Sequence, residues 1–225
     1  MFSRIAGRYD LMNRLMTAGQ DRRWRRRVIE RADLQPGSRL LDLGAGTGDL
    51  TRLALQQQPA VQVVAADFTL AMMRMGSKKG GLPFLAADAL QLPFESATFD
   101  AVVSGFLMRN VADLQVAIQE QYRVLKSGGR MVILDTTRPR RTLFAPFVRI
   151  HLNVVIPVLG RWLAGDSNAY RYLPESTRNF VTAEQLAEAL IAAGFQEVRF
   201  ECLMAGTIAI HWGKKAEERS AAEAG

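Results

Sequence analysis

The fold is decided by one segment, LLDLGAGTGDL at residues 40–50. Its apolar start is typical of a buried strand, and its glycines are typical of a tight turn. The residues from Asp49 onward are typical of a helix. Glycines at such a turn let the backbone approach a ligand closely, because a side chain would stand in the way. The segment therefore predicts a ligand-binding loop between a strand and a helix.

Apolar runs and helical patterns alternate after this segment. Continuous apolarity, without polar residues at every second position, is what a parallel strand covered by helices on both faces requires. We expect strands at residues 39–43, 61–66, 82–86, 101–104 and 131–134. Before the last run, apolar residues from Leu114 to Leu125 recur at helical spacing, and the pattern stops before Gly128.

The C-terminal part adds a helix and two strands. Thr182 and Gln185 stand at capping-box spacing, which predicts a helix over 182–193. Strands are expected near 197–203 and 207–212, and their short connection implies an antiparallel pair. The sequence therefore predicts an α/β fold: a doubly wound, Rossmann-like sheet of seven strands, mostly parallel with an antiparallel last strand.

A chain of 225 residues fits one compact domain. We assign residues 1–215 to that domain, with a helical segment over 1–35 and a helical insertion over 140–180. Residues 216–225 form a polar tail. The apolar stretch 143–164 inside the insertion is interrupted by prolines and arginines, which makes it a poor membrane span.

The charge balance is basic, with 29 Lys and Arg against 22 Asp and Glu and a formal net charge of +7. Much of the excess lies in RRWRRR at residues 22–27, which suits nucleic acid, an anionic membrane surface or an acidic substrate; a solvated helix face is the other interpretation. The single cysteine, Cys202, excludes an intrachain disulfide and a multi-cysteine metal site, and we expect no metal ion. The first residues lack the pattern of a secretion signal, so we expect a cytoplasmic protein.

Two cofactors use a strand, a glycine loop and a carboxylate at the tip of the next strand, which here is Asp67. Such a carboxylate can accept hydrogen bonds from both hydroxyls of a ribose. A dinucleotide fold requires a third glycine where this chain has Asp49, and a carboxylate in the first helical turn competes with a pyrophosphate for that position. S-adenosylmethionine has no phosphate and carries two positive groups, which suit Asp42 and Asp49.

The segment resembles the signature of class I methyltransferases, L-D-x-G-x-G-x-G followed by an acid at the end of the second strand. The resemblance implies S-adenosyl-L-methionine as the cofactor. Asp88 and Ala89 lie in a segment similar to the adenine-binding motif of these enzymes, and Ser104 lies at the tip of the fourth predicted strand. The expected cofactor-binding residues are Asp42, Gly44, Gly46, Thr47, Asp67, Asp88, Ala89 and Ser104.

A narrower resemblance covers nearly the whole chain. Residues 9–24, YDLMNRLMTAGQDRRW, resemble the N-terminal signature of the ubiquinone/menaquinone biosynthesis C-methyltransferases. The segments RVLKSGG at 123–129 and LDTTRP at 134–139 resemble their second signature, and residues 109–111 and 172–176 are similar to further family segments. The chain departs from the family pattern at Thr17 for serine, Asp21 for a frequent histidine, Ser127 for proline and Asp135-Thr136-Thr137 for a glutamate-bearing segment.

The resemblance implies methyl transfer to a ring carbon of a prenylated quinol, with demethylmenaquinol preferred to a benzoquinol precursor of ubiquinone. An aromatic carbon is a weak nucleophile unless a neighbouring hydroxyl loses its proton, and the resemblance points to Arg109, with Asn110 beside it. Because a guanidinium stays protonated in proteins, we expect Arg109 to be a fixed cation that lowers the pKa of the quinol, while a water removes the proton. Tyr9 is expected to lie over the methyl group or to form a hydrogen bond with the quinol ring. For Arg109 and Tyr9 the structural alternatives are a surface ion pair and a packed lid aromatic.

A prenylated quinol stays in the bilayer, so an enzyme that acts on its head group must reach the membrane surface. The arginines at 22–27 then suit peripheral contact with anionic lipid. Residues 1–35 and the insertion 140–180 suit a lid over the acceptor pocket, although an ordinary pair of core helices fits the apolar stretch of the insertion equally well. The sequence leaves the oligomeric state open.

Other functions compete with this one. A nucleic-acid methyltransferase is disfavoured because Ser104-Gly105-Phe106-Leu107 stands where such enzymes usually have a D/N-P-P-Y/F segment, and no recognisable RNA-binding module is present. We therefore expect no nucleic-acid partner. A small-molecule O-methyltransferase would have the same cofactor half and remains the alternative, and a binding module without turnover is the third.

Overall fold

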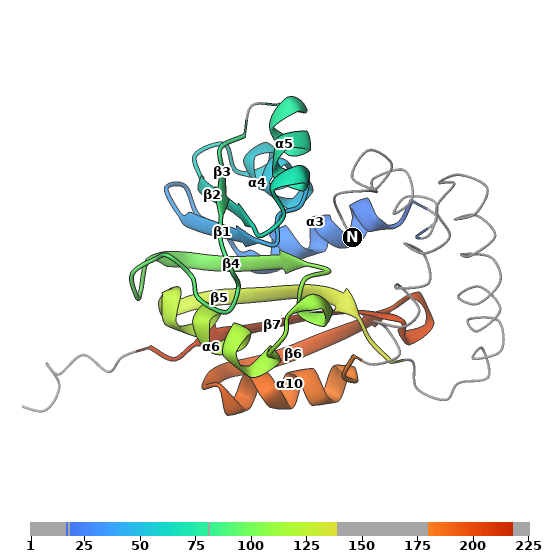
Figure 1. Cartoon of the computed structure of the whole chain (residues 1–225). Coiled ribbons are helices and arrows are strands. Elements are labelled where there is room, and N and C mark those ends of the chain that lie inside the picture. Colours follow the sequence, from blue (N-terminus) through green and yellow to red (C-terminus); the bar gives the residue numbers. More distant parts are fainter. Residues whose placement is uncertain (1–16, 18, 81, 139–179, 218–225) are drawn as a thin grey trace, which may run out of the picture.

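The computed structural model describes residues 17, 19–80, 82–138 and 180–217. Tyr9 therefore lies outside the described residues. So do residues 1–16 and 18 of the expected lid over 1–35, residues 140–179 of the insertion over 140–180, and residues 218–225 of the tail. The described residues comprise a sheet and the helices that cover it (Figure 1).

The sheet has seven strands in the order β3-β2-β1-β4-β5-β7-β6. Strand β7 is antiparallel to both of its neighbours, while the pairs formed by β1, β2, β3, β4 and β5 among themselves are parallel. The predicted fold class is confirmed. The strand bounds are β1 Arg39–Leu43, β2 Gln62–Asp67, β3 Phe84–Ala86, β4 Phe99–Gly105, β5 Leu125–Thr136, β6 Phe195–Leu203 and β7 Ile208–Lys215.

Helices cover both faces of this sheet. Figure 1 shows α6 and α10 in front of the sheet and α3 behind it. Helix α10 begins at the predicted capping box, in which the Thr182 hydroxyl accepts from Gln185 N and the Gln185 side chain accepts from Thr182 N. The helices are α3 Asp21–Ala32, α4 Asp49–Gln57, α5 Leu70–Lys78, α6 Leu114–Val124 and α10 Ala183–Ala192, with short 3-10 turns at η2 Met108–Asn110 and η4 Met204–Gly206.

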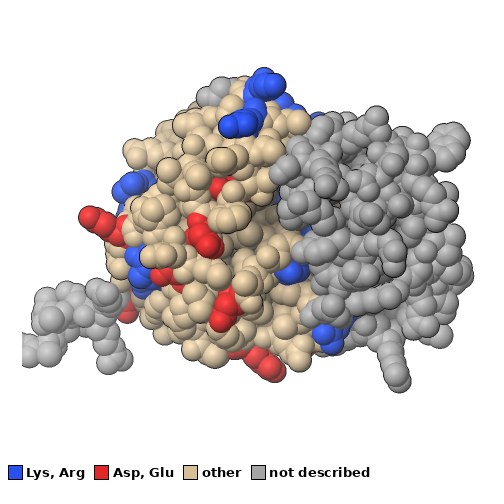
Figure 2. Space-filling view, viewed as in Figure 1, with Lys and Arg blue, Asp and Glu red and all other residues tan. Residues whose placement is uncertain are grey.

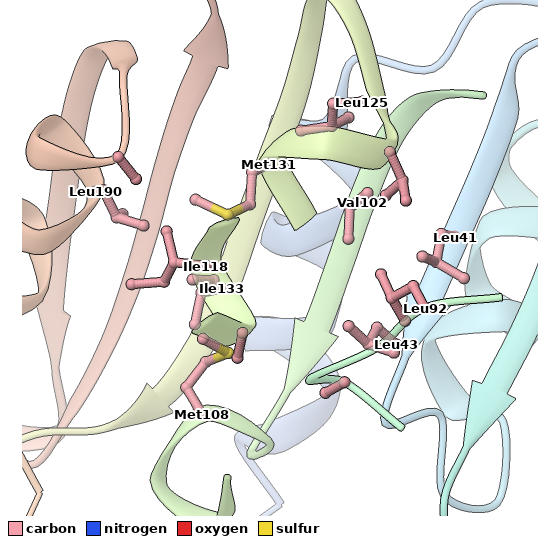
Figure 3. Packing of buried hydrophobic residues seen from close by; sticks show 14 of the residues in the cluster. Leu41, Leu43, Leu92, Val102, Met108, Ile118, Leu125, Met131, Ile133 and Leu190 are labelled. Carbon is pink, nitrogen blue, oxygen red and sulfur yellow. The ribbon is translucent and has the colours of Figure 1, made fainter. Parts of the chain in front are cut away.

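Successive residues of a buried strand point to opposite faces, and this divides the apolar core in two. On the front face, Leu41 of β1 packs in a cluster with Ile118 of α6 and Leu190 of α10 (Figure 3). On the rear face, Leu40 of β1 packs in a cluster with Val28 of α3. The continuous apolarity of β1 is therefore explained by burial on both faces.

Strand β5 differs from the sequence expectation. It begins at Leu125, directly after α6, whereas the apolar run predicted a start at Met131. Its pairing with β4 is irregular between Leu125 and Arg130, where Gly128 has a φ of +73°. Helix α6 ends at Val124, before these glycines, as predicted. The predicted strand start was wrong, because the glycines form a polar bulge inside a longer strand and hide its pattern.

The strand order creates the crevice that the site uses. From β1 the chain passes to β2 and β3 on one side, and it then returns to place β4 on the other side of β1. Ligands of open α/β sheets bind at the carboxyl ends of strands where the order reverses in this way. The fold therefore directs attention to the ends of β1 and β4.

Candidate cofactor and acceptor site

A cavity of about 330 Å³ lies at the carboxyl ends of β1, β2 and β4. Gly44 and Gly46 from the loop after β1, Asp67 from the end of β2, and Gly105 from the end of β4 form part of its wall. The rest of the wall is mostly apolar. It comprises Leu43, Phe68, Thr69, Met72, Ala87, Asp88, Ala89, Leu90, Phe106, Leu107, Asn110, Val111 and Ala112.

The loop after β1 needs glycine for conformation and for space. Gly44 and Gly46 have φ values of +70° and +59°, in the left-handed region that side chains rarely adopt. A Cβ added at Gly44 would also lie 3.0 Å from Leu107 Cδ1, tighter than ordinary packing. The loop backbone can therefore line the cavity only with glycine at these positions.

Asp67 holds this loop against the end of β2. Its Oδ2 accepts a hydrogen bond from Gly46 N at 2.7 Å, and its Oδ1 accepts from Thr69 N at 2.7 Å. A carboxylate oxygen has more than one lone pair, so these two bonds leave acceptor capacity on the side that lines the cavity. The expected place of Asp67 beside the cofactor loop agrees with this geometry.

Asp42 lies beneath the loop and does not line the cavity. Its Oδ2 accepts hydrogen bonds from Thr51 N at 3.0 Å and from Thr51 Oγ1 at 2.6 Å, which ties β1 to the first turn of α4. Its Oδ1 is buried and has no hydrogen-bond partner among the described residues. Burial raises the pKa of Asp42 to about 6, against the opposing effect of the two bonds from Thr51.

The remaining expected cofactor residues divide into wall residues and supporting residues. Asp88 and Ala89 line the cavity, and Asp88 Oδ1 accepts from Leu90 N at 2.9 Å, which orients the carboxylate. Ser104 is fully buried one residue before the wall residue Gly105, and its Oγ has no partner among the described residues. Thr47 is buried too, and its carbonyl accepts from the Arg52 side chain.

The sequence did not single out the apolar wall residues, among them Phe68 and Leu90. Phe68 is 77% exposed although it is a large apolar side chain, and it lines the cavity together with Leu90. The sequence offered one indication of the role of Phe68, namely its position directly after Asp67. An exposed phenylalanine at the mouth of a cavity offers a flat apolar surface on which a planar ring can stack.

Arg109 forms a buried ion pair. Its Nη1 donates to Asp135 Oδ1 at 2.6 Å, and the side chains are 5% and 1% exposed. Its backbone N–H also donates to Asp135 Oδ2 at 3.2 Å, and the guanidinium lies 5.0 Å from the centre of the Phe106 ring. The ion pair that we expected as an alternative exists, but it is buried rather than on the surface. Asp135 was missed as a site residue because only the pairing of β4 with β5 brings it here.

Asn110 lies next to this pair and reaches the cavity. Its Nδ2 donates to the Phe106 carbonyl at 2.8 Å, which fixes the amide in the η2 turn. It is one of the few polar groups in a wall otherwise built from Phe106, Leu107 and Val111. The structure thus brings Asn110 together with the cofactor loop, while Arg109 stands behind the wall.

No group of three or more histidine, cysteine or acidic side chains in the described part of the chain could hold a metal ion. No described helix is long and apolar enough to cross a membrane.

Comparison with known proteins decides between the cofactors. A model of the ubiE/COQ5 methyltransferase family matches residues 1–215. The chain belongs to this family. The family is one of S-adenosyl-L-methionine-dependent methyltransferases, so the chain is an enzyme of that class and the dinucleotide alternative is set aside.

Relatives with similar sequences cover nearly the whole chain. The chain is 47% identical over 218 residues to the ubiquinone/menaquinone biosynthesis C-methyltransferase UbiE of Desulfotalea psychrophila, which covers 96% of this chain and 89% of that protein. It is 46% identical over 220 residues to the demethylmenaquinone methyltransferase of Thermus thermophilus, which covers 96% of this chain and 100% of that protein.

A solved structure with the same fold contains the cofactor. The phosphoethanolamine N-methyltransferase 2 of Haemonchus contortus, in complex with S-adenosyl-L-methionine, aligns with a TM-score of 0.66 at 15% identity. The alignment covers 87% of this chain and 53% of that chain. At this identity the likeness concerns the fold alone.

The residues of this ubiE/COQ5 family member fit S-adenosylmethionine. The glycine loop leaves room for a ligand against the backbone, and Asp67 offers acceptors for a ribose. Asp49 occupies the first turn of α4, where it competes with a pyrophosphate but suits a cationic ligand. The unpartnered Oδ1 of Asp42 lies under the loop rather than in the cavity wall, and its charge suits an ammonium group in the cavity above it.

The pKa of Asp42 predicts how cofactor affinity depends on pH. A bound ammonium group favours the charged carboxylate, so binding lowers a pKa that is about 6 in the free protein. The affinity for S-adenosylhomocysteine, which keeps its ammonium group, should be highest above pH 6 and fall as the pH drops through 6. The limiting slope is about tenfold per pH unit, measured by calorimetry from roughly pH 5 to 7.

Asp42→Asn is the matched control, since it keeps the shape of the side chain and removes the titration. It should bind more weakly than the native protein, and its affinity should not vary over the same range. An unvarying affinity in the native protein would contradict the assigned role of Asp42.

Proposed function

We propose that this protein transfers a methyl group from S-adenosyl-L-methionine to a ring carbon of a polyprenylated quinol. Demethylmenaquinol is the preferred acceptor, and a benzoquinol precursor of ubiquinone is the second. The match of the family model over residues 1–215 carries the proposal, supported by the quinone-biosynthesis names of relatives at 46% and 47% identity. Both relatives named here match over nearly all of this chain.

The composition of the cavity supports an aromatic acceptor. S-adenosylmethionine supplies an activated methyl group, so the protein has chiefly to align the two reactants and to exclude water. The wall residues Phe106, Leu107 and Val111 are apolar and Asn110 is the polar residue among them, which suits a ring with few polar substituents. In this proposal Asn110 hydrogen-bonds a quinol hydroxyl, and Tyr9, outside the described residues, covers the ring or the methyl group.

Activation of the ring carbon is assigned to Arg109. The ring becomes a sufficient nucleophile when a neighbouring hydroxyl loses its proton, and a nearby cation stabilises the resulting phenolate. Asp135 compensates much of the charge of Arg109 in the structure, so the cation acts at short range. Water remains the proposed carrier of the proton, and the alternative acceptor is the Asp135 carboxylate, which is paired with Arg109.

The proposed reaction predicts a specific product. The purified protein, given labelled S-adenosylmethionine and demethylmenaquinol under reducing conditions, should form a product whose label is a ring C-methyl group, identified by mass spectrometry and NMR. A methoxy product would favour the alternative, a small-molecule O-methyltransferase. Tight cofactor binding without turnover on either quinol would contradict the proposal.

A further prediction concerns Arg109 and Asp135. Removing Arg109 alone would leave a buried carboxylate uncompensated, at a cost of about 3–5 kcal/mol in stability. The double variant Arg109→Gln/Asp135→Asn removes both charges and should fold. We expect its turnover to fall by about 10²–10³, with almost unchanged affinity for S-adenosylhomocysteine.

Asp135→Asn alone leaves Arg109 buried without its partner, at a similar cost in stability, so thermal denaturation must first show that this variant is folded. The folded variant then tests which partner does the chemistry. If Arg109 acts as a cation, this variant retains most of the turnover, and its pH–rate profile moves to lower pH because the quinol pKa falls. A loss as large as that of the double variant would identify Asp135 as the proton acceptor and contradict the role given to Arg109. Unchanged turnover in the double variant would do so as well.

Peripheral membrane contact is the third part of the proposal. The cluster at 22–27 separates into two groups in the structure: Arg22, Arg23 and Arg26 are exposed, whereas Arg27 pairs with Glu201 on β6. Helix α3 lies behind the sheet in the view of Figure 1, which Figure 2 shares, so Figure 2 shows the opposite face of the molecule. The exposed arginines would therefore form a basic patch on the far side, near the end of α3 that follows the N-terminal segment.

Replacing Arg22, Arg23 and Arg26 by glutamine tests the contact. Each basic residue near an anionic surface contributes about 1 kcal/mol, so the triple variant should bind vesicles rich in phosphatidylserine about 100-fold more weakly. Flotation with zwitterionic vesicles and at high salt supplies the controls. Native protein that floats equally with neutral and anionic vesicles, or not at all, would contradict this contact.

A further inference from the structure

Arg25 belongs to the arginine cluster at 22–27, all of which the structure describes. It is the member of this cluster whose side chain turns inward without forming a close ion pair. Its side chain is 11% exposed, whereas Arg22, Arg23 and Arg26 are exposed. Its Nε is buried and has no hydrogen-bond partner in the described structure. A buried guanidinium with an unused N–H group is costly unless another ligand completes it.

The carboxylates around Arg25 balance its charge at longer range. Nε lies 3.7 Å from Asp21 Oδ2, and Nη2 lies 3.6 Å from Asp49 Oδ2. Both distances are too long for hydrogen bonds. Asp21 is itself engaged, because it accepts a hydrogen bond from Thr17 Oγ1 at 3.3 Å. The guanidinium is thus held in place electrostatically, with its N–H groups not fully used by these two acids.

The position of Arg25 is next to the cofactor loop. Its Nη1 lies 3.9 Å from the place of a Cβ built on Gly105, and Gly105 lines the cavity at the end of β4. Asp49, its other contact, begins α4 directly after the loop. Burial raises the pKa of Asp42 under the loop, and the attraction of Arg25 opposes that rise. Arg25 therefore lies directly behind the wall residue Gly105, between the end of β4 and the start of α4, and is not itself part of the wall.

The cofactor brings both signs of charge to its amino-acid end. Asp42 and Asp49 suit its ammonium group, but they repel its carboxylate, which needs a cation close to the same loop. Arg52 is the other described arginine near the loop. Its Nη2 donates to the Thr47 carbonyl, and its Nη1 lies on the side of Gly48 that faces Leu82 and Phe84, neither of which lines the cavity. Arg25 is better placed.

We propose that Arg25 binds the carboxylate of the methionyl end of S-adenosylmethionine, using the guanidinium N–H groups that Asp21 and Asp49 leave available. The three acids Asp21, Asp42 and Asp49 then position the guanidinium and balance the charges, and Gly105 keeps the space between Arg25 and the cavity free of a side chain. This inference rests on the cofactor and not on the quinol acceptor, so binding in the absence of any acceptor tests it.

The test compares two ligands and measures their affinities by calorimetry. S-adenosylhomocysteine carries the carboxylate, and its decarboxylated analogue keeps the adenosine, the sulfur and the amino group. The native protein should bind S-adenosylhomocysteine about 10- to 100-fold more tightly than the analogue, the range of one charge-assisted contact. Arg25→Met should lose that preference by weakening only the ligand with the carboxylate.

Arg27→Met is the matched control, because Arg27 lies on the same helix but pairs with Glu201. It should keep the full preference. If Arg25→Met does not fold, Arg25→Gln, which retains a polar side chain, should still lose most of the preference. Four results would overturn the inference: no preference in the native protein, a preference kept without Arg25, equal weakening of both ligands, or loss of the preference in Arg52→Met instead.

Discussion

The site depends on one hydrogen bond, from Gly46 N to the carboxylate of Asp67. It joins the loop after β1 to the end of β2, two neighbouring parallel strands, and it places an acid and a glycine backbone on the same wall of the cavity. The left-handed glycines allow the approach, and the strand order makes it possible because β2 lies beside β1 in space. A side chain at either glycine would move the loop away from Asp67.

Around this bond the protein arranges buried charges in pairs of opposite sign. Arg25 lies near the loop after β1 between Asp21 and Asp49, and Arg109 and Asp135 lie behind the wall that continues from β4. In a medium of low polarity, an unpaired charge is costly and a paired one is held rigidly. Charged reactants therefore bind next to side chains whose positions are already fixed. Because the methyl donor is already activated, this preorganisation and the alignment of the two reactants are the main ways in which the enzyme can accelerate the reaction.

Local patterns predicted some parts of the fold and missed others. The capping box at Thr182, the apolar run of β1 and the antiparallel pair of β6 and β7 were predicted because neighbouring residues determine them. The long strand β5 was predicted only in its apolar half, since pairing with β4 and β7 draws in a polar, glycine-containing segment. Sheet pairing between distant strands can override a local pattern, and a single sequence does not display it.

The same division applies to the site. By itself the sequence determined the cofactor loop, the acid at the end of β2 and the family, because these depend on spacing within short segments and on matches along the whole chain. Only the tertiary structure decided that Arg109 is paired with Asp135, that Phe68 stands exposed at the cavity, and that Arg25 turns inward while its neighbours face the solvent. These facts arise from contacts between strands and helices far apart in the chain. Such contacts set burial and charge pairing, and burial and pairing determine what an ionisable side chain can do.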